Sequence, residues 1–346
     1  MSHLTPLPQS GTLAGGEPDP RDRARRRRRL RLAALVVVAA AGYGAWRAGV
    51  RPPRALGELF APPPTATPTP PPASPTPTAS PTATATPFAP SAGVIDPPPP
   101  FFRFGRPFDP PERAVPERSY PYGTNAEGRL LLHHGNDLGA PAGTEVRAID
   151  AGVVAYAGLD DGHRFGPDPD FYGRLVAVRH DATLDGQALI SLYGHLSSAS
   201  VRYGQRLARG DVLGTVGSEG VALGPHLHLE IRTALSDYAA TRNPLLFLAP
   251  LPGTGAVVAR VEDSLGRPLD DTMVGLFALD GGEPWIAQSR TYGQPPVNRT
   301  APFGEAVVHT DLPPGRYALS MVHHSATVRT EFEIQPDRVT FAVLAP

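Results

Sequence analysis

The stretch GPHLHLE, residues 224–230, concentrates side chains that could do chemistry. In a strand, residues two apart point to the same face, so His226, His228 and Glu230 would share one face. The leucines between them would take the other face and enter the core. This alternation weakens the alternative that both histidines are buried in a core, and it makes them candidate metal ligands.

A second stretch of this kind is LLHHGNDLGAPAG, which contains His133, His134 and Asp137. His133 and Asp137 share strand parity. His134 falls on the opposite side and is expected to be exposed or to lie behind the ligands. The alternative for this stretch is a polar loop in which the aspartate turns the backbone.

A third stretch is ISLYGHLS. Its alternation predicts an apolar face made by Ile190, Leu192 and Leu196, which leaves Tyr193 and His195 together on the other face.

Two histidines and one carboxylate drawn from these segments would form a three-ligand zinc site with an open position for water, the arrangement of catalytic zinc. The chain has no cysteine, which excludes a Cys-ligated metal site, a thiol nucleophile and a disulfide framework. Zinc held by nitrogen and oxygen donors is therefore favoured over a structural cysteine site.

Taken in order over roughly residues 120–245, the three segments resemble the lysostaphin/LytM-type zinc metallopeptidases of bacterial cell-wall metabolism. The motifs that carry the resemblance are HHGND at residues 133–137, YGHL at 193–196 and GPHLHLE at 224–230. The resemblance implies an endopeptidase that acts on the peptides of peptidoglycan and uses one zinc ion per chain.

Carried over residue by residue, the resemblance implies that His133, Asp137 and His228 ligate the zinc and that His195 and His226 form the catalytic pair beside it. Zinc would polarise the scissile carbonyl and activate a water molecule. One histidine would take the proton of that water, and the other would stabilise the oxyanion or protonate the leaving amine. The sequence does not divide these two roles.

Three features remain open around this predicted site. Glu230 either orients a ligand from behind or is an exposed strand carboxylate. The stretch LDDGHRFGPDPDFYG, residues 159–173, replaces a shorter turn that is usual in the family and predicts a surface loop beside the substrate groove. Its His163, like His180 and His309, is expected to face solvent.

The elements that must position these residues are short strands. From about residue 130 to 248, alternating apolar segments such as VRAIDAGVVAYAG, RLVAVRHD and DVLGTVG are separated by glycine-containing turns. No segment there has a helical period, so residues 116–250 are predicted to form a compact antiparallel β metallopeptidase domain.

A proline-rich stretch, APLPG, separates a second set of alternating strands. Residues 253–346 are predicted to form a small β-sandwich accessory domain. Its segments VEDSLGRPL and DLPPGRYAL resemble transthyretin-like, carboxypeptidase-regulatory-type domains, which implies a binding or spacer role.

The N-terminal third predicts a membrane attachment. Residues 1–29 are basic and cytoplasmic, because a block of arginines precedes the apolar run within residues 30–47. That run predicts a transmembrane anchor. The alternative is a cleaved signal peptide and a secreted protein. Residues 48–115 are rich in proline and threonine and predict a disordered linker.

Composition limits the alternatives. A net charge of −1 argues against nucleic acid as a partner, and the absence of lysine excludes a lipoyl-type or biotinyl-type carrier. No cofactor other than the metal is expected, and the oligomeric state is not predicted. The sequence thus predicts a mainly β, membrane-tethered, extracytoplasmic zinc endopeptidase that hydrolyses peptide cross-links of peptidoglycan. The alternative is a non-catalytic peptidoglycan-binding or regulatory module of the same fold.

Overall fold

The computed structural model describes residues 92–111, 114–161, 165–282, 284–293 and 295–346. All of them belong to one compact unit, Thr82–Pro346. The predicted cytoplasmic segment, the anchor or signal segment and the linker up to residue 91 lie outside the described residues. Within the described ranges, no helix has the length and apolar composition needed to cross a membrane.

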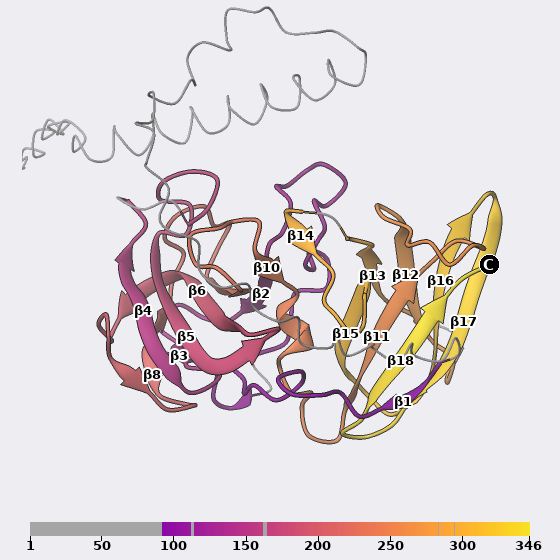
Figure 1. Ribbon diagram of the computed structural model, residues 1–346, viewed down its shortest axis with the longest axis horizontal. Coiled ribbons are helices and arrows are strands. Elements are labelled where there is room, and N and C mark those ends of the chain that lie inside the picture. The colour runs from indigo at the N-terminus through magenta and orange to yellow at the C-terminus, as the bar shows by residue number, and fades with distance from the viewer. Residues whose placement is uncertain (1–91, 112–113, 162–164, 283, 294) are drawn as a thin grey trace, which may run out of the picture. The chain divides into compact units, whose positions relative to one another are not determined.

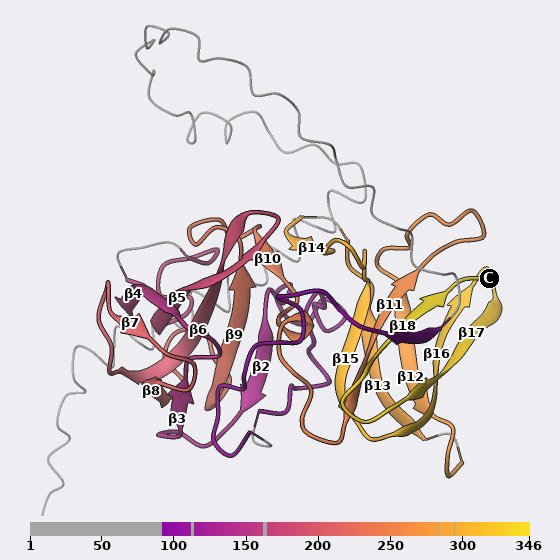
Figure 2. The same ribbon diagram turned by 60° about the horizontal axis from the view of Figure 1, so that its bottom comes forward.

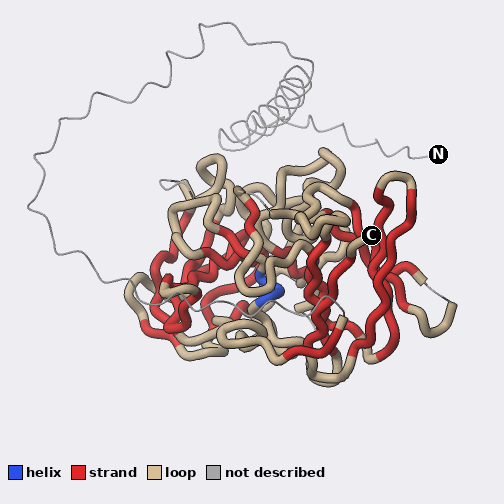
Figure 3. The backbone as a smooth tube through the Cα atoms, turned by 45° about the vertical axis from the view of Figure 1, so that its right-hand side comes forward, coloured by secondary structure: helices blue, strands red, loops and turns tan. Residues whose placement is uncertain are grey.

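The fold is mainly β, which confirms the prediction from the alternating segments (Figures 1 and 2). Strands dominate the described chain, and a short 3-10 turn, η4 (Pro244–Leu246), is the blue segment near the centre of Figure 3. The strands form three sheets.

The first sheet has ten strands and carries the histidine-rich segments. Its main path runs through β14 (Val297–Asn298), β10 (Thr241–Arg242), β9 (His226–Arg232), β6 (Gln187–Ala199), β5 (Arg174–Leu184), β4 (Gly152–Leu159) and β7 (Arg206–Leu207). Beside this path, β2 (Asn136–Gly139) pairs with β9, and β8 (Val212–Val216) pairs with β6 and with β3 (Glu145–Arg147). The pairs are antiparallel except for β10 with β14.

Two four-stranded sheets complete the fold. The inner sheet contains β1 (Gly93–Ile95), β18 (Val339–Leu344), β11 (Gly255–Val261) and β15 (Val307–Leu312), in this order. The outer sheet contains β13 (Trp285–Arg290), β12 (Met273–Ala278), β16 (Gly315–His323) and β17 (Ala326–Ile334). The resemblance of this region to transthyretin-like domains stays a prediction.

Strand alternation divides the inner sheet between two hydrophobic cores. Val258 and Phe341 face a core shared with the ten-stranded sheet, whereas Val257 and Leu344 face the core shared with the outer sheet. The inner sheet is therefore a middle layer. The C-terminal sheets extend the core of the predicted metallopeptidase region and are not separated from it by a spacer.

Residues 92–111 depart from the predicted disordered linker. Strand β1 pairs antiparallel with β18, and Phe101, Phe104 and Phe108 are buried in the core that the ten-stranded sheet shares with the inner sheet. The physical reason is composition, because the four phenylalanines of FFRFGRPF supply apolar surface that the preceding Pro/Thr tract lacks.

Candidate metal centre

Strands β2 and β9 bring two of the predicted ligands directly opposite each other. The strands pair antiparallel, with Asp137 aligned with His228. The core side of β9 is filled by its two leucines and Ile231, all fully buried, which turns His226 and His228 to the other side, as strand parity predicts. The pairing register alone thus brings a carboxylate and an imidazole together.

The third predicted ligand, His133, lies outside the strands, at the end of loop 120–133. Its carbonyl oxygen accepts a hydrogen bond from Gly123 N at 2.9 Å, and its N donates to Thr124 O at 2.8 Å. Its ring stacks on Tyr120 with the ring centroids 4.1 Å apart and the planes at 4°. These contacts fix the direction of the imidazole.

Three donor atoms of these residues converge. His133 Nε2 lies 3.2 Å from Asp137 Oδ1 and 3.3 Å from His228 Nδ1, and His228 Nδ1 lies 2.8 Å from Asp137 Oδ1. Ligands about 2.0–2.1 Å from a tetrahedral zinc ion stand about 3.3 Å apart. The two nitrogens and one oxygen therefore fit zinc in both type and spacing.

The other nitrogen of each imidazole has an acceptor. His133 Nδ1 lies 2.6 Å from the carbonyl oxygen of Tyr120, and His228 Nε2 lies 3.1 Å from Glu230 Oε1. An N–H directed at these acceptors leaves Nε2 of His133 and Nδ1 of His228 for a metal. Metal-binding histidines are commonly held in this way.

His195 and His226 lie beside the three donors. Their ring centroids are 4.8 Å apart, and His226 Nε2 lies 3.5 Å from Asp137 Oδ1. In each ring Nδ1 is 2.8 Å from a backbone carbonyl oxygen, that of Glu219 for His195 and that of Gly224 for His226. Both histidines are therefore supported through Nδ1, which leaves Nε2 available.

The backbone at His195 breaks the strand alternation. Its φ is +61°, and the pairing of β6 with β5 and with β8 is irregular on either side of it. As a result Tyr193 does not share a face with His195, contrary to the prediction. Tyr193 is buried in the core and its hydroxyl accepts from Ile149 N at 3.0 Å. Strained backbone of this kind often marks functional residues.

The charges of the centre follow from burial and proximity. Burial, together with the nearby His228 and His226, lowers the pKa of His195 to about 3, so this ring is neutral at physiological pH. Burial opposes ionisation of Asp137, but His133 and His228 outweigh it and hold the pKa of the carboxyl well below its usual range. Burial also opposes the charged form of His228, yet its bonds to Asp137 and Glu230 raise its pKa to about 9.

A buried network supports His228 from behind. Glu230 Oε1 accepts from His228 Nε2 and, at 2.5 Å, from the hydroxyl of Tyr172. Glu230 Oε2 accepts from Arg232 Nε at 2.6 Å, and Arg232 Nη2 donates to the Tyr172 hydroxyl at 2.9 Å. Glu230, Tyr172 and Arg232 are all fully buried, so Glu230 is not an exposed carboxylate.

Sequence reasoning missed Arg232 and Tyr172. A signal for Arg232 existed, because it has the same strand parity as His226, His228 and Glu230. Tyr172 ends the 159–173 insertion, and nothing in its local pattern identifies it.

The remaining histidines stay outside the donor group. His134 is buried, not exposed, and stacks on Tyr238 with centroids 3.6 Å apart, and burial lowers its pKa to about 4. The solvent-facing predictions for His180 and His309 are wrong, because both are buried on strands, β5 and β15. His163 lies outside the described residues.

A known family model matches the region that holds this centre, and curated proteins match part of the chain. Residues 131–242 match the model of Peptidase family M23. The DD-carboxypeptidase/endopeptidase Mpg of Neisseria meningitidis is 41% identical over 101 residues, which cover 29% of this chain and 20% of Mpg. The peptidoglycan DD-endopeptidase ShyC of Vibrio cholerae is 34% identical over 115 residues, which cover 33% of this chain and 22% of ShyC.

The chain therefore spans about a fifth of the length of these curated relatives. Among solved structures, the catalytic domain of the antimicrobial peptidase lysostaphin from Staphylococcus simulans is 26% identical, with a TM-score of 0.31, and covers 39% of this chain and 91% of that domain. Residues 131–242 are thus similar to M23 (LytM-type) peptidase domains, and the curated relatives are peptidoglycan-peptidase proteins by name.

Proposed function

We propose that this protein is a zinc-dependent endopeptidase that hydrolyses peptide cross-links of peptidoglycan. The observation that carries the proposal is the convergence of His133, Asp137 and His228, with two further imidazoles beside them. A structural zinc site has four protein ligands, whereas three ligands with adjacent acid–base groups are typical of a catalytic site.

Each side chain has a part in this proposal. His133, Asp137 and His228 would hold the metal. When bound, zinc supplies a Lewis acid for the scissile carbonyl and lowers the pKa of a water molecule toward neutrality. His195 is neutral and presents Nε2, so it can accept a proton. His226 presents Nε2 in the same way and is the more exposed of the two.

The two histidines together provide a proton acceptor and a donor for the leaving amine. Glu230, with Arg232 and Tyr172 behind it, keeps the tautomer and orientation of His228 fixed. The loop 120–133 does the same for His133 through the Tyr120 carbonyl oxygen.

The cellular setting is part of the proposal. An anchor within residues 30–47 would hold the protein in the cytoplasmic membrane, with the domains after it outside the cytoplasm, where peptidoglycan lies. The arginine block before residue 32 and the Pro/Thr-rich tract after residue 60 support this orientation. Cleavage of a signal peptide would instead give a secreted enzyme.

The direct test is to measure zinc stoichiometry in the purified protein and to identify by mass spectrometry the muropeptides that it releases from sacculi. The proposal expects one zinc per chain and peptide-bond cleavage that stops with chelator and in His195→Ala. A zinc-loaded protein that binds sacculi and releases nothing would contradict it and would favour the non-catalytic peptidoglycan-binding module.

A further inference from the structure

We propose that Tyr292, in the segment that follows strand β13 of the outer sheet, is a positioning residue for the metal ligand His133. The inference rests on the metal site proposed above. It assigns to the C-terminal region a part in building that site, beyond a spacer or binding role.

Of the three donor residues, His133 is the one that the ten-stranded sheet does not place. Asp137 and His228 are held by the β2–β9 pairing, directly opposite each other. His133 depends on loop 120–133. Leu130 and Leu131 of that loop are exposed, so they add no core packing that would hold His133 in place.

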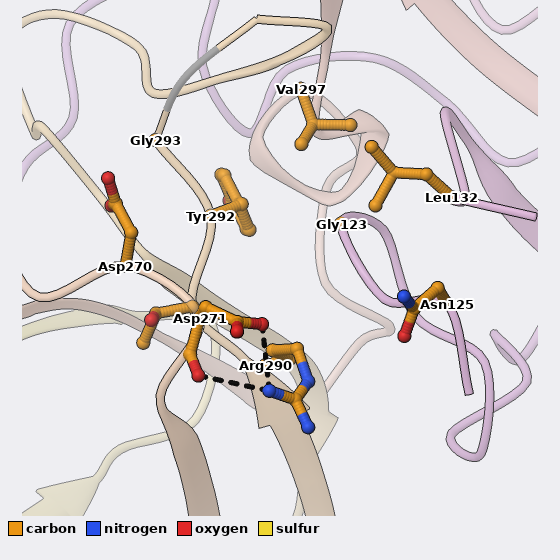
Figure 4. A pocket seen from close by; sticks show the side chains of 10 residues that line it. Gly123, Asn125, Leu132, Asp270, Asp271, Arg290, Tyr292, Gly293 and Val297 are labelled. Atoms are coloured by element: carbon orange, nitrogen blue, oxygen red, sulfur yellow. Dashed lines mark hydrogen bonds and ion pairs between the residues drawn. The ribbon is translucent and has the colours of Figure 1, made fainter. Parts of the chain in front are cut away.

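The base of the loop packs on residues that come from far along the chain. Tyr122, Tyr292 and Val297 form a buried cluster against which Leu132 packs. The rings of Tyr122 and Tyr292 meet edge to face, with centroids 4.9 Å apart and planes at 86°. Figure 4 shows Tyr292 and Val297 on one side of this junction and Gly123 and Leu132 on the other.

The contact at Gly123 is the closest one. Its φ is +82°, and a Cβ atom there would lie 2.7 Å from Cδ1 of Tyr292, so the ring rests directly on the backbone. The same residue donates its N–H to the carbonyl oxygen of His133 at 2.9 Å. One hydrogen bond therefore separates the tyrosine ring from the metal ligand.

Tyr292 is itself held firmly. Its ring is almost fully buried, and its hydroxyl accepts from Asn243 Nδ2 at 3.0 Å and lies 3.3 Å from Glu305 Oε1. Asn243 also caps η4 by accepting from Leu245 N at 3.1 Å. A ring fixed at both ends can hold the base of the loop in one position, which pre-organises His133 before metal binds.

The test is Tyr292→Ala in the full chain, with zinc affinity measured by competition with a chelator. We expect zinc to bind about 10–100-fold more weakly, the range found when groups that orient a metal ligand are removed. Amide hydrogen exchange of Gly123 and His133 in the zinc-free protein should become faster. Tyr292→Phe retains the ring on Gly123 but loses the hydroxyl contacts, so it should restore most of both properties.

Leu319→Ala is the matched control, because it removes a fully buried side chain from the outer-sheet core without touching the loop. It should lower thermal stability and leave zinc affinity unchanged.

If Tyr292→Ala does not fold, Val297→Ala removes packing from the same cluster and should shift both measurements in the same direction. Unchanged affinity and unchanged exchange in the folded variant would overturn the inference. Failure of the wild-type protein to bind zinc would instead overturn the proposed metal site, and the exchange experiment would still report on the loop.

Discussion

At the scale of single residues, each imidazole of the centre is oriented by a contact to one of its two ring nitrogens, which leaves the second nitrogen available. Three of the four rings, those of His133, His195 and His226, are directed at backbone carbonyl oxygens. His228 is the exception, because its partner is the buried carboxylate of Glu230, which is paired in turn with the buried Arg232. Of the four imidazoles, only that of His228 therefore depends on side-chain charge.

Glu230→Gln should destabilise the protein and weaken metal binding. The change removes the counter-charge of Arg232, which is fully buried, and leaving one partner of a buried ion pair costs about 3–5 kcal/mol. We expect the loss in urea unfolding of the zinc-free protein, with zinc binding weaker by about 10-fold or more. The control is Glu331→Gln, whose ion pair with Arg316 is exposed and worth less than about 1 kcal/mol. Equal unfolding free energies for the two variants would refute this prediction.

The variants His228→Ala and His226→Ala should distinguish the proposed roles of these residues, His228 as a zinc ligand and His226 as a catalytic group. Loss of His228 removes one of three donors, so zinc should no longer copurify with the protein. Loss of His226 leaves the three donors intact, so zinc should remain while the rate falls by about 10²–10⁴-fold. Metal analysis and cleavage rates on sacculi check both outcomes. Zinc loss in His226→Ala would assign it to the metal instead.

At the scale of elements, the site depends on close contact between the HHGND segment and strand β9. A Cβ atom at Gly135 would lie 2.4 Å from the carbonyl oxygen of Leu229 and 2.8 Å from His228 Nε2. Real Cβ atoms do not approach other atoms so closely, so any larger residue forces the two segments apart.

Gly135→Ala should therefore disrupt the metal site by shifting β2 away from β9. We expect zinc affinity to fall by at least about 10-fold and the unfolding free energy to fall by about 1–3 kcal/mol, the usual cost of overpacking. Gly139→Ala, at the far end of β2, is the matched control, since nothing lies within 4 Å of a Cβ atom at that position. A normal zinc affinity in Gly135→Ala would show that the contact is not needed.

A second element-scale feature is Glu305, just before β15. The residue is fully buried, and its Oε2 accepts from Thr300 N at 2.8 Å. Burial raises its pKa from 4.5 to about 8, because backbone and hydroxyl donors only partly replace water.

Glu305 should make the protein less stable as pH rises. Between about pH 4.5 and pH 8 the folded state keeps the proton that the unfolded state has lost, so the unfolding free energy falls across this window by a few kcal/mol at most and then levels off. Urea unfolding at about pH 5 and about pH 9 measures the slope. In Glu305→Gln the unfolding free energy should change less with pH than in the wild type. Identical slopes would show that Glu305 does not cause the pH dependence.

At the scale of the whole molecule, the predicted metallopeptidase region and the C-terminal sheets share one core. The inner sheet gives one face to each neighbour, and residues 92–111 lie along it. A buried ion pair between Arg106 and Asp311, at 2.5 Å, links this segment to strand β15 of the inner sheet.

A fragment of residues 116–250 should therefore fold poorly compared with residues 92–346. The shorter fragment loses Phe101, Phe104 and Phe108 and exposes the face that Val258 and Phe341 cover. Each lost aromatic side chain costs about 3–5 kcal/mol in a core, which exceeds the stability margin of many domains. Thermal unfolding and solubility distinguish the two fragments. Cooperative unfolding of 116–250 at the same temperature as 92–346 would refute the shared core.

Both the mainly β class and the residues that converge at the candidate metal centre could be predicted from the sequence. Parity was right on β9 because a regular strand repeats every two residues, so His226, His228 and Glu230 had to share a face. It failed at Tyr193 because the positive φ of His195 and the irregular pairing around it break that period.

What covers each face depends on contacts between segments that are distant in the sequence. Glu230 is buried because Arg232 and Tyr172 close over it, and residues 92–111 are ordered because a sheet formed some 150–250 residues later accepts β1 and the phenylalanines. The loop that holds His133 packs on Tyr292 through Gly123, and no local pattern connects Tyr292 with that loop. Local spacing encodes which side chains alternate, whereas burial depends on partners that are distant in sequence and meet only on folding.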